Sequence, residues 1–341
     1  MNDPLLRTVI ISTLVLLLGL ACLLESYGIW FGHPGLVDRP KLFLNEPGGL
    51  IEPESRISRK SFHKCIVSDQ QLGWFCRPLI NTSIHLDGQE ARFSFRTDQN
   101  GFRDRPRNPK KEGTFRLITL GGSSTFGWGV DGESTWPAIL DAFLAPDAEC
   151  INLAMYGYGT DQALFTYKHL GYMFIPDAVV VSVSSDDPEH VLADSRLIGD
   201  HEVKKPRFDE GENALYHDIE RLSPSDRHNR GRDLVFDILL ELEMEVSTIG
   251  AGFYVLSIPF NQNLPEAGDL ENGIPHVHDH GRFFSNLVKF GEDNNIIVID
   301  PRKEILDCFP PDALATVPTG HSGRVANSII AQAVEKSLKQ E

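Results

Sequence analysis

The stretch "RLITLGGSSTFGWGV", residues Arg116–Val130, reads as a buried strand that runs into a glycine-rich turn. Ser123 and Ser124 stand in this turn between Gly122 and Gly127. Such a turn can cradle a phosphate against a helix N-terminus, or it can present a serine nucleophile at the carboxyl edge of a sheet. The rest of the chain has to separate these two functions.

Apolar segments of strand length recur along the chain and alternate with helix-like stretches. Alternation of this kind predicts an α/β fold, a doubly wound parallel sheet of about five strands with helices on both faces. The polar section 197–230 is interpreted as an insertion loop near the edge of the site. The expected strands are 115–121, 149–154, 177–184, 252–259 and 295–300, and the expected helices are 134–144, 160–174, 232–250, 282–294 and 324–338.

The N-terminal segment differs in character from everything that follows. Residues 8–24, "TVIISTLVLLLGLACLL", carry no charge and come close to the ~20 residues that span a bilayer. Tyr27 and Trp30 follow as interfacial aromatics. A cleaved signal peptide is the alternative, but the small residues of its cleavage site are missing. Residues 1–31 are therefore predicted to be a single membrane anchor, with the body of the protein outside the cytoplasm.

Composition and charge limit the possible functions and divide the rest of the chain into segments. A net charge of −16 argues against a nucleic-acid binder, because phosphate neutralisation needs clustered Lys and Arg. Residues 32–112 are rich in Pro, Gly and charge and are predicted to be a linker with an accessory β segment, which includes "ARFSFRTD" at 91–98. Residues 113–341 are predicted to form the α/β domain.

The cysteines and histidines suggest a disulfide but no metal site. In an oxidising compartment Cys65 and Cys76 could close a small loop, whereas Cys22, Cys150 and Cys308 receive no role. No cysteine spacing is typical of zinc. The alternating histidines of "HVHDH" at 276–280 are interpreted as a solvated loop, although they could bind a metal. Neither a metal nor a cofactor is expected.

The details of the turn argue against nucleotide binding. A dinucleotide fold wants G-x-G-x-x-G, and a P-loop wants a lysine before Ser or Thr, whereas this turn reads G-G-S-S-T-F-G. Polar or glycine-rich segments follow the next strands and precede the last helix, with Asn152 and Gly157, then Asp186 and Asp187, and finally His321. A serine, a glycine loop, a polar pair and a late histidine make up the layout of a serine hydrolase.

On these residues the chain resembles the SGNH (GDSL-type) hydrolases over roughly 115–336, and their membrane-anchored bacterial members best. The upstream segments "LGWFCRPLINTS" and "TDQNGFRD" are similar to a segment that those members carry. The resemblance implies the flavodoxin-like SGNH hydrolase fold. It also implies an esterase or deacetylase-like activity on an ester-bearing small molecule or an acylated glycan, with no cofactor.

The resemblance assigns roles to individual residues. It makes Ser123 the nucleophile and His321 the general base, and it places the oxyanion hole at Ser123, Gly157 and Asp186. A serine hydroxyl needs an imidazole to take its proton, and a backbone N–H that stabilises the oxyanion is typically worth ~3 kcal/mol. Glycine at 157 would let the backbone approach the substrate closely.

Three positions depart from the family pattern. The acid expected before the histidine is Thr319 here, and the neighbouring Pro318 cannot replace it. The oxyanion asparagine is Asp186, and the aspartate of the serine block is Gly122. Asp187 or Asp312 could substitute for the lost acid.

The sequence therefore predicts an ester hydrolase with a Ser–His pair and a degraded triad. The alternative is a catalytically weakened relative that binds an acylated glycan or a protein partner. A non-catalytic interpretation of single residues also remains open. Ser123 could be an ordinary turn serine, His321 could be a residue at the start of a helix, and Asp186 could be a capping or solvated carboxylate.

Overall fold

The computed structural model describes residues 56–86, 92–208, 221–258, 270–271, 274–275, 278–308 and 323–340. The chain divides into two compact units, Met1–Leu42 and Phe43–Glu341, and every described residue belongs to the second. The predicted membrane segment 8–24, with Cys22, lies outside the described residues. Among the helices of the described ranges, none is long and apolar enough to cross a membrane.

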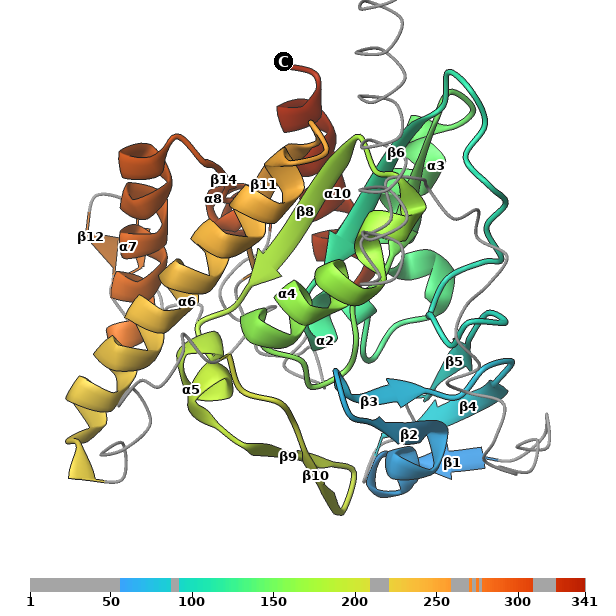
Figure 1. Ribbon diagram of the computed structural model, residues 1–341, viewed down its shortest axis with the longest axis horizontal. Coiled ribbons are helices and arrows are strands. Elements are labelled where there is room, and N and C mark those ends of the chain that lie inside the picture. The colour runs from blue at the N-terminus through green and yellow to red at the C-terminus, as the bar shows by residue number, and fades with distance from the viewer. Residues whose placement is uncertain are drawn as a thin grey trace, which may run out of the picture. The chain divides into compact units, whose positions relative to one another are not determined.

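A five-stranded parallel sheet forms the centre of the second unit (Figure 1). All four neighbouring pairs run parallel, and the strand order is β14-β11-β8-β6-β7. In chain order this is the 2-1-3-4-5 arrangement of flavodoxin-like sheets. The predicted α/β class and all five expected strands are thus confirmed, as β6 (Phe115–Leu120), β7 (Ala148–Asn152), β8 (Ala178–Val183), β11 (Gly252–Ser257) and β14 (Ile297–Ile299).

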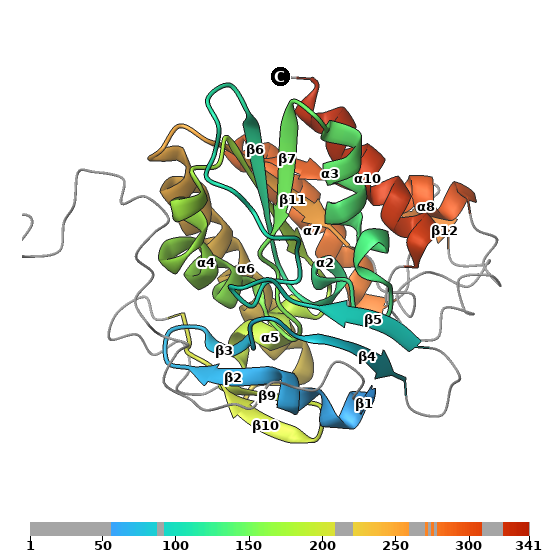
Figure 2. The ribbon, with the colours of Figure 1, turned by 90° about the vertical axis from the view of Figure 1, so that its right-hand side faces the viewer.

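Helices cover both faces of the sheet, and each face has its own apolar core (Figure 2). Along β8, Val179 and Val181 belong to one core, whereas Val180 belongs to the other. Strands buried on both faces read as continuous apolar runs, which is why they could be found in the sequence. One layer contains α4 (Thr160–His169), α6 (Pro224–Ser247) and α7 (His278–Asn294), and the other α3 (Trp136–Leu144), α8 (Arg302–Cys308) and α10 (Arg324–Leu338).

The section 197–230, expected as a loop, is largely structured where it is described. β9 (Ser195–Ile198) and β10 (His201–Lys204) form an antiparallel hairpin. α6 begins already at Pro224, because the Ser223 hydroxyl accepts the N–H of Asp226 at 3.2 Å and proline suits the first helical turn. The loop prediction was wrong because polar side chains do not prevent a capped helix or a two-stranded hairpin from forming.

The accessory segment packs against the carboxyl edge of the central sheet (Figure 2). It contains a three-stranded sheet of order β1-β4-β5, a β2-β3 hairpin and the 3₁₀ helix η1. Phe62 of η1 lies at its centre and contacts the rings of Trp128 and Tyr156 at centroid distances of 4.9 and 5.2 Å. The bounds are β1 Arg56–Ser58, η1 Arg59–Cys65, β2 Ile66–Asp69, β3 Gly73–Cys76, β4 Asn81–His85 and β5 Arg92–Arg96.

Two 3₁₀ turns and two short strands lie elsewhere in the described chain. They are the 3₁₀ turns η2 (Gly132–Ser134) and η3 (Gly171–Phe174) and the strands β12 (Leu270–Glu271) and β13 (Ile274–Pro275), which pair with each other.

The suggested disulfide between Cys65 and Cys76 is not formed, since both are buried free thiols. The β2-β3 register pairs Cys76 with Ile66 rather than with Cys65, and the Cys76 thiol lies 3.4 Å from the Met155 sulfur. Burial raises the pKa of the Cys65 thiol to about 12, so it stays protonated.

Candidate active site

The glycine turn lies where the order of the central sheet reverses. The chain passes from β6 to β7 on one side and then returns to β8 on the other side. Open α/β sheets bind ligands at such a switch point, outside the carboxyl ends of the strands. The short helix α2 (Ser123–Phe126) follows β6, and α5 (Asp187–Leu192) follows β8. The predicted site residues Ser123 and Asp186 therefore lie at the same edge of the sheet.

The turn requires glycine at 121 and distinguishes its two serines. Gly121 has a φ of +135°, and a Cβ there would lie 2.0 Å from the Ser182 hydroxyl oxygen. Ser123 is partly exposed at the start of α2. Ser124 is buried, and its hydroxyl has no hydrogen-bond partner among the described residues. Ser123 is therefore the serine of the pair that can meet a substrate.

Buried polar side chains hold α2 in place. The Thr125 hydroxyl donates to Ser182 Oγ at 2.6 Å, and Asn152 Nδ2 donates to the Thr125 carbonyl at 2.9 Å. Arg103, from the stretch "NGFRD", donates to the carbonyl oxygens of Phe126 and Gly127 at the end of the helix. Burial lowers the pKa of Arg103 to about 10, which leaves it charged at neutral pH. The glycine turn and α2 are thus fixed from both the sheet and the accessory segment.

The loop after β7, which contains Gly157, is bound to the glycine turn. The Met155 N–H donates to the Gly121 carbonyl at 3.1 Å, which joins the two loops directly. Gly157 has a φ of +85°, and a Cβ there would meet Ile198 Cδ1 at 2.7 Å and Trp74 Cζ2 at 3.1 Å. Both the backbone angle and the close neighbours thus favour glycine at this position.

Trp74 of β3 is bonded to both residues that flank Gly157. Its indole Nε1 donates to the Tyr156 carbonyl at 2.9 Å, and the Tyr158 hydroxyl donates to the Trp74 carbonyl. Trp74 and Tyr158 are buried, and Tyr156 is half-buried. The accessory segment therefore sets the conformation of the glycine loop.

The two aspartates after β8 have different surroundings. Asp186 occupies the N-cap position of α5, yet its side chain makes no capping hydrogen bond. Asp187 is buried and accepts hydrogen bonds from the Thr160 hydroxyl at 2.8 Å and from the backbone N–H and hydroxyl of Ser184 at 2.7 and 2.8 Å. Burial raises the pKa of Asp187 to about 6. Asp187 thus ties the start of α5 to the start of α4.

Positive charge from the β9-β10 hairpin faces this acidic edge. Arg196 of β9 is partly buried, which lowers the pKa of its guanidinium, and Asp186 and Asp187 act on it in the opposite direction. After β10, Lys205 forms a fully buried ion pair with Asp161 of α4. The positive charge of Arg196 is thus close enough to interact with both aspartates that follow β8.

Several predicted site residues lie outside the described ranges, namely His321, Thr319, Pro318 and Asp312. The nearest described residue to His321 is Gly323, which precedes α10. In the first turn of α10, Asn327 Nδ2 donates to the carbonyl of Ser134 at 2.8 Å. The start of α10 is therefore bound to η2, which follows the glycine turn in the sequence.

In the sequence, the stretches around Trp74 and Arg103 are similar to a segment of the membrane-anchored SGNH hydrolases, but this similarity assigns no role to either residue. The "LGW" segment supplies the indole that holds the glycine loop, and "NGFRD" supplies the arginine that binds the end of α2. No pattern in the sequence indicated that Arg196 or the Asp161–Lys205 ion pair would lie near the candidate site. As for metal ligands, His63, Asp200 and His201 come together among the described residues and include no predicted site residue.

No known protein family matches the sequence, and no curated protein matches it either. Solved structures with a similar fold include the esterase EstA from Pseudoalteromonas (16% identity, TM-score 0.41, covering 66% of this chain and 97% of that chain). Others are a GDSL-like lipase from Bacteroides thetaiotaomicron (10%, 0.40, 69% and 92%) and a lipase/acylhydrolase from Enterococcus faecalis (15%, 0.38, 67% and 96%). The roles of individual residues therefore rest on this chain's own sequence and geometry.

Proposed function

We propose that this chain is a serine ester hydrolase in which Ser123 attacks an ester carbonyl and His321 takes its proton. The observation that carries the proposal is the hydrogen bond from Met155 N–H to the Gly121 carbonyl. It holds the partly exposed Ser123 beside the Gly157 loop at the switch point of the sheet. A nucleophile needs oxyanion donors close by, and the direct bond between the two loops supports this arrangement.

The chemistry follows from these positions. Ser123 Oγ would form a bond to the carbonyl carbon while His321 accepts the hydroxyl proton and later donates it to the leaving alkoxide. The backbone N–H groups of Ser123 and Gly157 would stabilise the negative charge on the former carbonyl oxygen. Arg196 supplies positive charge near Asp186, which stands where the resemblance implies a neutral amide.

The reach of His321 is consistent with this role. It precedes Gly323 by two residues, so it stays within about 7 Å of backbone from the start of α10. That start is bound to Ser134, and Figure 2 draws the C-terminal end of α10 on the side away from α2. The expected substrates are an ester-bearing small molecule or an acylated glycan.

Covalent labelling with a fluorophosphonate tests the proposal, because only an activated serine reacts. We expect the full-length chain to be labelled and Ser123→Ala to lose the label. Ser124→Ala is the matched control and should keep it, since the Ser124 hydroxyl is buried. An unlabelled wild type, or a label that survives Ser123→Ala, would refute the hydrolase.

The second candidate function is binding without turnover, and Asp186 and Thr319 favour it. A carboxylate repels the oxyanion, and without an acid the histidine loses its orientation. Such a protein would bind an acylated glycan or a protein partner at the same edge of the sheet. The absence of labelling together with retained binding of an acetylated oligosaccharide would support this function.

We further propose that residues 8–24 anchor the chain in a membrane, with the body on the extracytoplasmic side. The uncharged run and its flanking aromatics support this proposal. Membrane fractionation of full-length protein with an intact N-terminus tests it. Recovery in the soluble fraction would contradict it.

A further inference from the structure

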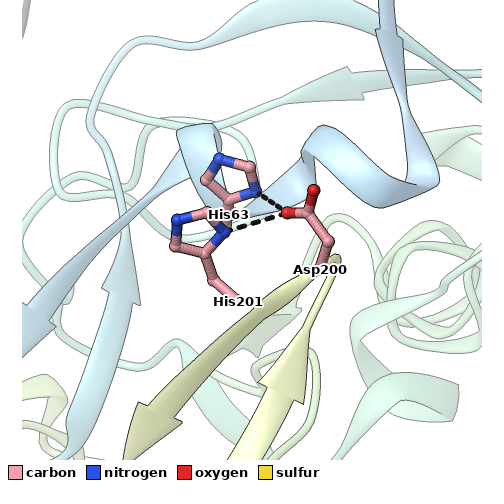
Figure 3. A group of neighbouring side chains, drawn as sticks. All are labelled: His63, Asp200 and His201. Carbon is pink, nitrogen blue, oxygen red and sulfur yellow. Dashed lines mark hydrogen bonds and ion pairs between the residues drawn. The ribbon is translucent and has the colours of Figure 1, made fainter.

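Two histidines and an aspartate meet where η1 contacts the β9-β10 hairpin (Figure 3). His63 Nδ1 and His201 Nδ1 lie 2.8 and 2.9 Å from the same oxygen of Asp200, Oδ1. A ring nitrogen of each histidine and a carboxylate oxygen all lie within 4.8 Å of one another. Segments about 140 residues apart in the sequence thus bring three potential metal ligands together.

The backbone around this cluster is held in place without any metal. The Asp200 N–H donates to the carbonyl of Lys60 at 3.0 Å, so the turn of the hairpin is bound to η1. Gly199 makes this approach possible, because a Cβ there would lie 2.3 Å from the same carbonyl oxygen and its φ is +68°. The ligands are therefore carried on two elements whose relative position is already fixed.

Imidazole nitrogen with carboxylate oxygen is a ligand set that suits zinc and neighbouring divalent ions. Zinc bonds of about 2.0–2.1 Å place tetrahedral ligand atoms about 3.4 Å apart. The observed separations of 2.8 and 2.9 Å would therefore open by only about half an ångström around an ion. His201 Nδ1 is hydrogen-bonded to Asp200 Oδ1, whereas His63 Nδ1 also lies 3.1 Å from the carbonyl oxygen of Lys60. The ion would replace the proton in each of these hydrogen bonds.

One ring has to turn for both nitrogens to point at the ion. The rings of His63 and His201 are stacked, with centroids 3.8 Å apart and planes at 20°. The side chain of His63 is 20% exposed, whereas those of Asp200 and His201 are 58% and 62% exposed. His63 is thus the fixed ligand, and the hairpin side chains have the freedom to rearrange.

The surroundings favour a cation. A hollow of about 600 Å³ adjoins the cluster and is lined by both histidines together with two carboxylates, Asp69 and Glu202, and one cation, Lys204. Additional carboxylates raise the local concentration of a divalent ion, and the net charge of −16 acts in the same direction. A three-ligand site at the edge of such a hollow leaves room for water at the remaining position.

We propose that His63, Asp200 and His201 bind a divalent transition-metal ion of the zinc class, and that this ion links the β9-β10 hairpin to η1. The sequence predicted no metal here, because the ligands converge only through the fold. The hairpin also carries Ile198, whose Cδ1 would lie 2.7 Å from a Cβ at position 157, so the ion would fix one wall of the glycine loop. The site stands on its own residues and does not depend on the proposed hydrolase activity.

Titration calorimetry with Zn²⁺ tests the site on the full-length chain without a polyhistidine tag, after treatment with a chelator. The background carries His276→Gln, His278→Gln and His280→Gln, so that the second histidine-rich stretch does not bind the ion. We expect one ion per chain and a higher melting temperature in its presence.

Variants then assign the ligands. His63→Gln and His201→Gln should each weaken zinc binding at least about tenfold and abolish the rise in melting temperature. His169→Gln is the matched control, an exposed histidine of α4 outside the cluster, and should bind as the background does. Cu²⁺ substitution should give an electron paramagnetic resonance spectrum with nitrogen coupling that His63→Gln reduces.

Two results would overturn the site. One is the absence of saturable zinc binding in the background protein whose fold is intact by circular dichroism. The other is binding that His63→Gln and His201→Gln leave unchanged. Fluorophosphonate labelling of Ser123 is scored separately, so a failed hydrolase does not count against the metal site.

Discussion

The indole Nε1 of Trp74 donates a hydrogen bond of 2.9 Å to the carbonyl oxygen of Tyr156. The peptide unit between Tyr156 and Gly157 is planar, so fixing its oxygen also fixes the direction of the Gly157 N–H. That N–H is the proposed oxyanion donor. A side chain of the accessory segment thus orients a group of the candidate active site without reaching the substrate.

Trp74→Phe should lower the rate of ester hydrolysis and change substrate binding little. The variant keeps an aromatic ring but removes the donor, so the Gly157 N–H is no longer held toward the oxyanion. We expect kcat to fall about 10- to 100-fold with KM nearly unchanged, because the lost contact acts mainly in the transition state. Steady-state kinetics on an activated aryl ester measure kcat and KM separately.

Trp128→Phe is the control for this prediction. It replaces a buried indole of the same apolar core by a smaller ring and does not remove the donor or the acceptor of the Trp74–Tyr156 hydrogen bond. If the two variants lose stability and activity equally, the indole of Trp74 has only a packing role.

Gly121→Ala should destabilise the protein by roughly 3 kcal/mol or more, through a strained φ and a clash with the Ser182 hydroxyl. Adding Ser182→Ala removes the nearest atom and should restore part of the loss, while the backbone strain remains. Urea unfolding measures both. Gly132→Ala is the control, since no atom lies within 4 Å of a Cβ there, and it should change stability by less than about 1 kcal/mol. Equal effects at the two glycines would contradict the prediction.

Asp187 gives the stability a dependence on pH with a definite sign. Its pKa is raised by burial to about 6 in the folded protein, whereas an unfolded aspartate titrates near ~3.9. The folded state therefore holds this proton more tightly. Its contribution to stability is fully present below about pH 4 and is lost as the pH rises through about 6.

Asp187→Asn removes this titration and keeps the shape of the side chain. The free energy of unfolding of the wild type relative to the variant should fall between pH 4 and pH 7. Asp104, whose pKa burial also raises to about 6, is present in both proteins and its effect cancels. Urea titrations across this range measure the difference, and a difference independent of pH would show that Asp187 stays ionised.

The central sheet could be predicted because each strand is buried on both faces and reads as an apolar run, as β8 does. The positions of Ser123 and Gly157 followed from the same pattern, since loops at the carboxyl ends of parallel strands share one edge. The supporting contacts could not be predicted in this way. Trp74 and Tyr156 are 82 positions apart, and no local pattern encodes that hydrogen bond.

The wrong predictions have a similar origin. The sequence of β9 and β10 does not alternate between apolar and polar residues, so it did not indicate strands. The two strands pair with each other, and the turn between them is bound to the backbone of η1 at Lys60. Short separation made a Cys65–Cys76 bridge attractive, but the register of β2 and β3 pairs Cys76 with Ile66. Both outcomes depend on strand pairing, which composition does not specify.

Thr319→Asp should raise the activity, because it restores the acid that the resemblance implies for orienting His321. A carboxylate at this position would hold the imidazole in the correct tautomer and stabilise the imidazolium formed during attack, and its loss from a triad typically costs on the order of 10⁴ in rate. We expect a gain of at least about tenfold in kcat/KM on an aryl ester at pH 7.5, measured after subtracting the rate of Ser123→Ala. Thr316→Asp is the matched control, since it adds the same charge to the same stretch at a position to which the resemblance assigns no role, and it should leave the rate unchanged. Asp186→Asn should add a further gain by replacing a repelling oxygen with an N–H donor. If Thr319→Asp and Thr316→Asp give the same rate as the wild type, a missing acid does not limit His321, and another group of the protein orients it.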